Sequence, residues 1–218
     1  MKAVIILSGG MDSGVLLADI IKSKEYEKVY ALTFNYGSNH NNIENACAVI
    51  LASKYNVEEH KIVRLPFFKN ILKSSLLEGA DKIPEGHYAE ESMKQTVVPF
   101  RNGIMLSIAA GYADSIGAEE LLIGNHAGDH FIYPDCRPAF INYMQDAIRF
   151  GTDSEVRLKS PYCHITKKKI GKIGKDLEFD FRMTYTCYKG REKHCGVCGS
   201  CTERKEALEG FDTTEYEA

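Results

Sequence analysis

Short apolar runs alternate with amphipathic segments along most of the chain. Residues 3–7 (AVIIL) are rich in β-branched side chains, which is typical of a strand buried on both faces. Residues 12–23 instead place apolar side chains three and four positions apart, the spacing of a helix with one buried face. The same alternation predicts further strands at 28–34, 60–65, 120–123 and 156–160, and further helices at 42–55, 101–116, 138–150 and 166–177.

This order of elements predicts an α/β fold with a doubly wound, parallel, five-stranded sheet. Parallel neighbours need long crossovers, and right-handed helical crossovers cover both faces of the sheet. Residues 66–100 interrupt the pattern with scattered Pro and Gly and a polar middle. We expect this stretch to be an insertion that faces the substrate.

Composition is ordinary for a globular protein. The 218 residues are 44% hydrophobic and 26% charged. No apolar run approaches the roughly 18–20 residues that span a bilayer, and the apolar start is shorter than the roughly 7–15 residues of a signal-peptide core. We therefore expect a cytoplasmic protein with no membrane partner.

Charge is unevenly distributed. The net charge is −3, yet residues 157–205 hold 13 Lys and Arg against 5 Asp and Glu, a local net charge of +8. The overall balance argues against wholesale nucleic-acid binding, and a basic stretch is more often a solvated face. We expect no stable nucleic-acid partner. An RNA-binding metal module remains the alternative from another class of function.

The first predicted strand runs directly into the sequence SGGMDS at residues 8–13. Two glycines let the backbone turn sharply and approach an anion, and the helix that follows offers free N–H groups. The sequence fits neither the Walker loop nor GxGxxG, but it resembles the SGGxDS signature of the PP-loop ATP pyrophosphatases. We expect ATP to bind at Leu7, Ser8, Gly9, Gly10, Met11, Asp12 and Ser13.

Two residues of this loop are also candidates for catalysis. The Ser13 hydroxyl can donate a hydrogen bond to a phosphate oxygen. Asp12 can hold Mg²⁺ beside the phosphates, or it can cap the helix. The alternative is a glycine turn that caps a helix and binds nothing.

Four of the seven cysteines lie within fifteen residues near the C-terminus. Cys187, Cys195, Cys198 and Cys201 have the short spacing of a tetrahedral Zn²⁺ site, with an iron–sulfur cluster as the rival. Four thiolates close the coordination shell, so we expect a structural metal. His194 is then a neighbour of the site and not a ligand.

A polar loop follows the fourth predicted strand, where parallel sheets bind ligands. So many hydrogen-bonding groups are costly to bury unless they meet solvent or a polar ligand. His126 and Tyr133 belong to this group. We expect Asp129 and Asp135 to read the amidine edge of a guanine-like base and Arg137 to face a carboxylate or phosphate. The alternative is a surface loop in which His126 and Asp129 cap the next helix.

Together these motifs closely resemble the 7-cyano-7-deazaguanine synthase family of queuosine biosynthesis, and the resemblance runs nearly end to end. The combination is far more specific than any single motif. It comprises SGGMDS (8–13), FNYG (34–37), VPFRN (98–102), YPDCRP (133–138), ITK (165–167) and TCYKG…CGVCGSC (186–201).

The resemblance implies a Rossmann-like PP-loop domain over residues 1–180, a zinc-binding appendage over residues 181–218, and a homodimer. It also implies an ATP-dependent carbon–nitrogen ligase with Mg²⁺ and Zn²⁺. This enzyme would convert 7-carboxy-7-deazaguanine and ammonia to 7-cyano-7-deazaguanine through adenylated intermediates. Lys167 would join Asp12 and Ser13 in catalysis. Besides the polar loop, the substrate would meet Tyr36, His40, Arg101 and Asn102.

Two features depart from the family pattern. Ser38 stands where the family usually has glutamine, and the loop GNHAGDHFI before YPDC is unusually rich in histidine. Both lie where the substrate is expected. An alternative is therefore a paralogue that keeps the ATP chemistry but makes or transfers amide-stage deazaguanine in an antiphage or nucleic-acid-modification pathway.

Overall fold

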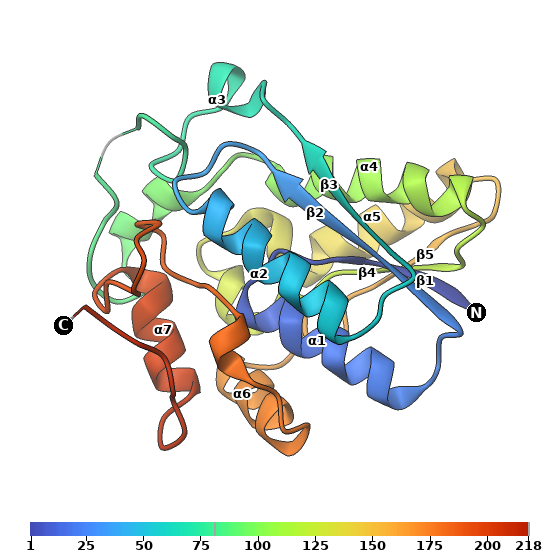
Figure 1. Cartoon of the computed structure of the whole chain (residues 1–218). Coiled ribbons are helices and arrows are strands. Elements are labelled where there is room, and N and C mark those ends of the chain that lie inside the picture. Colours follow the sequence, from blue (N-terminus) through green and yellow to red (C-terminus); the bar gives the residue numbers. More distant parts are fainter. Residues whose placement is uncertain (81, 218) are drawn as a thin grey trace.

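One sheet of five parallel strands organises the chain, in the order β3-β2-β1-β4-β5 (Figure 1). The structure is a computed structural model that describes residues 1–80 and 82–217. Every pair of neighbouring strands is parallel, which confirms the predicted doubly wound sheet. The strands are β1 (Lys2–Ile6), β2 (Lys28–Asn35), β3 (Glu59–Arg64), β4 (Glu120–Leu122) and β5 (Arg157–Lys159).

Helices cover both faces of this sheet (Figure 1). Because successive side chains of a strand point to opposite faces, Ala3 and Ile5 pack with one layer of helices, and Val4 and Ile6 with the other. Across the described residues, no helix has both the length and the apolar character that crossing a membrane requires. The first layer holds α1 (Met11–Ser23), α2 (Asn41–Lys54) and α6 (Lys167–Asp176), and the second holds α4 (Arg101–Ser115) and α5 (Pro138–Gly151).

The insertion over residues 66–100 contains a short helix, α3 (Phe68–Ile71), and a 3₁₀ helix, η1 (Glu91–Thr96). Among its described residues none is in the wall of the main cavity, but Tyr88 and Met93 line a smaller pocket that shares Tyr133 and Lys167 with it. The Thr96 hydroxyl of the insertion also lies 2.8 Å from the hydroxyl of Tyr133. The insertion therefore lies next to the cavity, and its contact with substrate stays a prediction.

The C-terminal segment packs on the helices that cover one face of the sheet. Its helix α7 (Gly199–Ala207) lies beside α6 (Figure 1), and Ala207 belongs to the same core cluster as Ile170 of α6. Within the segment itself, the fully buried guanidinium of Arg204 donates to the Thr184 hydroxyl at 2.9 Å and to the Phe181 carbonyl at 2.8 Å. A domain boundary between residues 180 and 181 stays a prediction.

Candidate active site and metal centre

A cavity of about 200 Å³ opens at the carboxyl ends of β1, β2 and β4. Open parallel sheets bind their ligands at this edge. The phosphate loop, α2, α4, the loop after β4, α6 and the C-terminal segment all contribute to its wall. Among the predicted site residues, those in the wall are Ser8, Gly10, Met11, Asp12, Ser13, Tyr36, His40, Arg101, Asn102, Asp129, Tyr133 and Lys167.

The phosphate loop presents two hydroxyls and an open helix end to the cavity. Gly10 is the N-cap of α1 and no side chain caps this end, so its first-turn N–H groups are available to a ligand. The Ser8 and Ser13 hydroxyl oxygens lie 3.0 Å apart, and the Gly10 N–H donates to the Ser8 hydroxyl at 3.1 Å. This arrangement suits a chain of phosphate oxygens.

Two predicted loop residues shape the loop from behind the cavity wall. Leu7 is fully buried in the core, and its carbonyl accepts a hydrogen bond from the Thr33 hydroxyl. Gly9 has a φ of +88°, and a Cβ at this position would lie 2.1 Å from the Glu44 carbonyl oxygen. Glycine is therefore required both for the backbone conformation and for the close approach to α2.

Replacing Gly9 with alanine should remove most ATP binding and destabilise the fold, because a backbone oxygen cannot move aside as a flexible side chain can. Gly79→Ala is the matched control: its φ is +81°, but no atom lies within 4 Å of the added Cβ. The control carries only backbone strain of about 1 kcal/mol. Calorimetric ATP binding and thermal melting should separate the two variants. Equal losses in both would contradict the packing role of Gly9.

An ammonium group lies beside the phosphate loop. Lys167 Nζ is 3.1 Å from Asp12 Oδ2 and 2.9 Å from Glu203 Oε2. Burial alone would lower the pKa of Lys167, but the carboxylates of Asp12, Glu203 and Asp129 outweigh burial and raise it. The lysine is therefore charged at neutral pH and can stabilise negative charge on a leaving phosphate group.

Asp12 has one oxygen left for a ligand. Its Oδ1 is buried and has no hydrogen-bond partner within residues 1–80 and 82–217. Leaving such an acceptor unpaired costs about 1–3 kcal/mol, so a cation that contacts it would stabilise the site. Mg²⁺ prefers oxygen ligands from one or two carboxylates together with substrate phosphates. Asp12 therefore fits a magnesium ion that arrives with ATP.

His126 lies beneath this cluster and outside the cavity wall. It is 1% exposed, and its Nε2 is 3.8 Å from Asp12 Oδ2 and 3.7 Å from Asp129 Oδ2. Its Nδ1 accepts the Gly128 N–H, while Asp129 accepts the His126 N–H, so the pair caps the 3₁₀ helix η2 (Ala127–His130). The predicted capping role is thus confirmed, but the surface-loop alternative is not, because His126 is buried and Asp129 lines the cavity.

Two residues predicted to contact substrate lie elsewhere. Asp135, in the 3₁₀ helix η3 (Pro134–Cys136), accepts the Asn102 N–H at 2.7 Å and so satisfies a free donor at the start of α4. Arg137 is exposed, and its side chain donates to the His130 carbonyl at 3.0 Å. Asp135 therefore acts on the cavity indirectly, through its hydrogen bond to Asn102 and its charge near Arg101, which both line it.

Ser38, which departs from the family pattern, also lies outside the cavity wall. Ser38 is 1% exposed and does not line the cavity. Its N–H donates to Asn41 Oδ1 at 2.8 Å, which fixes the turn before α2. Serine at this position therefore contributes no group to the cavity wall.

Other residues of the site were missed by sequence reasoning. Glu44 follows His40 by four positions, so both share one face of α2, which was an available signal. Tyr188 belongs to the TCYKG motif, and its hydroxyl lies 3.0 Å from that of Tyr133. No sequence motif pointed to Glu203, because only the tertiary fold brings it to Lys167.

Glu203 connects the cysteine-rich segment to the phosphate loop, since α7 carries it toward Lys167. Replacing Glu203 with glutamine removes one of the two carboxylates that hold this lysine. We expect kcat to fall about tenfold, the effect of one charge-assisted hydrogen bond, with metal content unchanged. Glu206→Gln, exposed on the same helix, should retain wild-type kcat. Steady-state kinetics that show equal kcat for both variants would contradict this role.

The four C-terminal cysteines form one buried cluster. All four Sγ atoms lie within 4.8 Å of one another, and those of Cys195 and Cys201 are 4.0 Å apart. A tetrahedral zinc site with bonds of about 2.3 Å has sulfur atoms about 3.8 Å apart, so the donor set fits this metal. The Cys195 N–H points at the Cys187 sulfur, at 3.3 Å, as expected around thiolates.

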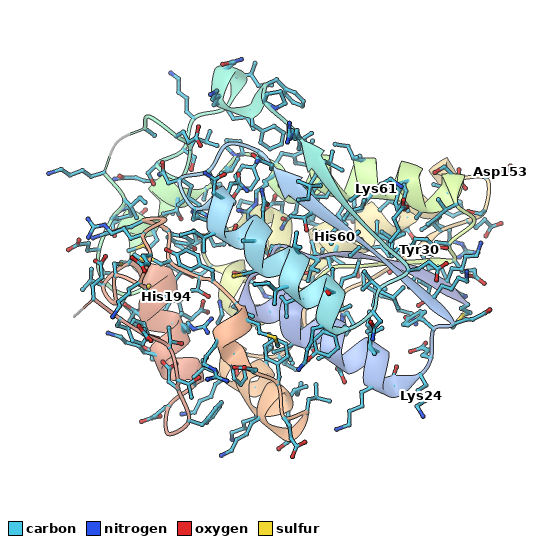
Figure 2. All side chains as sticks on the ribbon, in the orientation of Figure 1. Lys24, Tyr30, His60, Lys61, Asp153 and His194 are labelled. Carbon is cyan, nitrogen blue, oxygen red and sulfur yellow. The ribbon has the colours of Figure 1, made fainter. Side chains whose placement is uncertain are left out.

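His194 lies beside this cluster, as expected, and is not part of it. Figure 2 shows its side chain next to α7. Its Nε2 accepts the Thr186 N–H at 3.1 Å, and its ring packs against Tyr185 and Tyr216. These contacts engage Nε2 of His194 and stabilise the backbone around the cysteine cluster.

Comparison with known proteins agrees with this site. Residues 2–212 match the family model described as "Queuosine biosynthesis protein QueC". The chain is 53% identical to a 7-cyano-7-deazaguanine synthase of Desulfotalea psychrophila, with 99% of each chain covered. It is 50% identical to a synthase of the same name from Methanoregula boonei, with 100% of each covered.

Solved structures share the fold at low sequence identity. The U34-tRNA thiolase NcsA from Methanococcus maripaludis, solved with its [4Fe-4S] cluster, is 18% identical with a TM-score of 0.54, covering 96% of this chain and 65% of that one. The NMN synthetase from Francisella tularensis is 17% identical with a TM-score of 0.50, covering 87% and 68%. With the family model and the synthases matched over nearly the full length, the chain belongs to the QueC family of queuosine biosynthesis proteins.

Proposed function

We propose that this protein is an ATP-dependent carbon–nitrogen ligase that converts 7-carboxy-7-deazaguanine and ammonia to 7-cyano-7-deazaguanine. One observation carries the proposal: the Asp12–Lys167 pair lies at an SGGxDS loop, in a cavity with aromatic and polar walls. Relatives that cover nearly the whole chain bear the name of this synthase.

The reaction needs activation because a carboxylate is a poor electrophile. In the first step a carboxylate oxygen attacks the α-phosphorus of ATP, and pyrophosphate leaves. Ammonia then attacks the acyl carbon and AMP leaves, giving the amide. A second ATP activates the amide oxygen in the same way, and loss of AMP and two protons leaves the nitrile. Each activation therefore consumes one ATP and releases pyrophosphate and AMP.

The chain supplies binding and charge for both activations. Ser8 and Ser13 hydroxyls and the N–H groups at the start of α1 would bind the phosphates. The Lys167 ammonium would stabilise the charge that develops on pyrophosphate. Mg²⁺ held by Asp12 would neutralise the phosphates during ATP binding.

The cysteine cluster would hold zinc in a structural role. Four buried thiolates close a tetrahedral shell and leave no position for substrate. Reduced thiolates and the use of ATP fit a cytoplasmic location. The family resemblance further suggests a homodimer, for which light scattering should give twice the mass of one chain.

The direct test is incubation with 7-carboxy-7-deazaguanine, ammonium and Mg-ATP, followed by chromatography and mass spectrometry. We expect the nitrile, with two AMP and two pyrophosphate per nitrile. ADP as the nucleotide product would refute α–β cleavage. An amide that accumulates and is never dehydrated would instead support the paralogue that makes amide-stage deazaguanine.

A further inference from the structure

Glu44 is a carboxylate in the cavity wall to which the proposed reaction assigns no role. It lies one turn after His40 on α2, and its side chain is 16% exposed. His40 Nε2 is 3.5 Å from Glu44 Oε2, and within residues 1–80 and 82–217 the carboxylate accepts no hydrogen bond. Both of its oxygens are therefore open to donors from a ligand.

Its surroundings favour such a ligand. Burial raises the pKa of Glu44 to about 8, and the positive charge of Arg101 opposes this increase. Burial also lowers the pKa of His40 to about 4, so this histidine is neutral at pH 7 and supplies no charge to Glu44. With a pKa of about 8, the Glu44 carboxyl is mostly protonated at pH 7, and N–H donors on a bound ligand would favour its ionised form.

The other cavity carboxylates are already engaged. Asp12 pairs with Lys167 through Oδ2 and keeps Oδ1 for Mg²⁺, and Asp129 Oδ2 accepts the His126 N–H. Asp135, which was predicted to read a base, lies outside the wall and accepts a backbone N–H. Within the described wall, Glu44 is thus the carboxylate that neither accepts a hydrogen bond nor pairs with a lysine.

Flat side chains lie near Glu44 in the same wall. The Tyr188 and His40 rings have centroids 5.7 Å apart. The Arg101 guanidinium lies 5.7 Å from the Tyr36 ring centroid and donates to the Tyr36 hydroxyl at 3.2 Å. Aromatic and guanidinium planes of this kind stack on heterocyclic bases.

Hydrogen-bond chemistry decides which base a carboxylate prefers. A guanine-type ring carries an N1–H and a 2-amino group on one edge, and the two carboxylate oxygens can accept both. A hypoxanthine-type ring lacks the amino donor. An adenine-type ring presents a lone pair at N1, which would face a carboxylate oxygen unfavourably.

We propose that Glu44 binds the N1–H and 2-amino edge of the deazaguanine substrate and thereby selects a guanine-type ring. This inference rests on the proposed function and specifies the residue that reads the base. Arg101 and Tyr36 line the same cavity and are joined by a hydrogen bond, so the ring would lie against these side chains with its edge toward Glu44.

The test compares two ligands on three proteins. The ligands are 7-carboxy-7-deazaguanine and the analogue that lacks the 2-amino group, and the proteins are wild type, Glu44→Gln and Glu44→Asp. Carboxylate-dependent ATP–pyrophosphate exchange reports the first activation, and calorimetry reports binding without ATP. Asn42→Ala, exposed on the same helix, is the control and should match wild type.

We expect wild type to prefer the amino-bearing ligand by about 10- to 100-fold, the effect of one charge-assisted hydrogen bond. Glu44→Gln should reduce this preference to about one, with KM for ATP changed less than about twofold. Glu44→Asp keeps the charge on a shorter side chain and should restore part of the preference. A merely structural role would instead weaken both ligands equally.

Two results would overturn the inference. One is an unchanged preference in Glu44→Gln, and the other is an increase in KM for ATP with the preference intact, which would place adenine at Glu44. Failure of the proposed function has a different signature: wild type would show no exchange, while calorimetry would still report the Glu44-dependent preference for the amino-bearing ligand.

Discussion

Asp12→Asn should lower kcat about 100- to 1,000-fold while the protein stays folded. The substitution removes the negative charge that pairs with Lys167 and that attracts Mg²⁺ to the open oxygen, but it keeps the size of the side chain. Losing one preorganised electrostatic group at a reacting centre typically costs this much. Kinetics of AMP release, together with thermal melting, measure the two effects separately.

Asp19→Asn is the matched control on the same helix. Asp19 accepts a hydrogen bond from the Tyr162 hydroxyl at 3.0 Å and does not line the cavity. We expect a small loss of stability from this variant and nearly wild-type kcat. If Asp12→Asn retains kcat within about threefold of wild type, the electrostatic role of Asp12 is wrong.

Cys198→Ser should remove the metal and most of the folded protein. A hydroxyl is a poor substitute for a thiolate, and apparent zinc affinities of about 10–16 kcal/mol contribute directly to folding. Cys198 is also the N-cap of α7, which carries Glu203 to Lys167. Loss of the metal should therefore disturb the active site as well as the C-terminal segment.

Elemental analysis and soluble yield measure this effect. We expect one zinc per wild-type chain and almost none in the variant. Cys47→Ser is the control, because Cys47 packs beside the cluster without belonging to it, and this variant should retain its zinc. Iron with a visible absorption band would favour the iron–sulfur alternative. A folded, active Cys198→Ser protein would refute the structural role.

Local patterns were sufficient to predict most of the fold. The run at residues 3–7 predicted a strand buried on both faces, and β1 contributes side chains to both cores. Each predicted helix ends within a few residues of its observed bounds, because apolar spacing and caps act over one or two turns. The short 3₁₀ elements were not predicted, since they depend on contacts between loops.

The site was predictable only where its residues are contiguous. The loop at 8–13 and the cysteine set were found because the ligand groups follow one another in sequence. Asp135 was misjudged because polarity alone does not show whether a carboxylate meets a ligand or a backbone N–H. Glu44 and Glu203 reach the site from separate helices, and their roles depend on tertiary packing.

Oxygen transfer from substrate to nucleotide tests the central claim, carboxylate adenylation, most directly. The substrate is prepared with ¹⁸O in both carboxylate oxygens and incubated with ammonium, Mg-ATP and the enzyme. Mass spectrometry of the nucleotide should show one ¹⁸O in each of the two AMP molecules released per nitrile. Label in inorganic phosphate together with ADP, or AMP without label, would contradict the account.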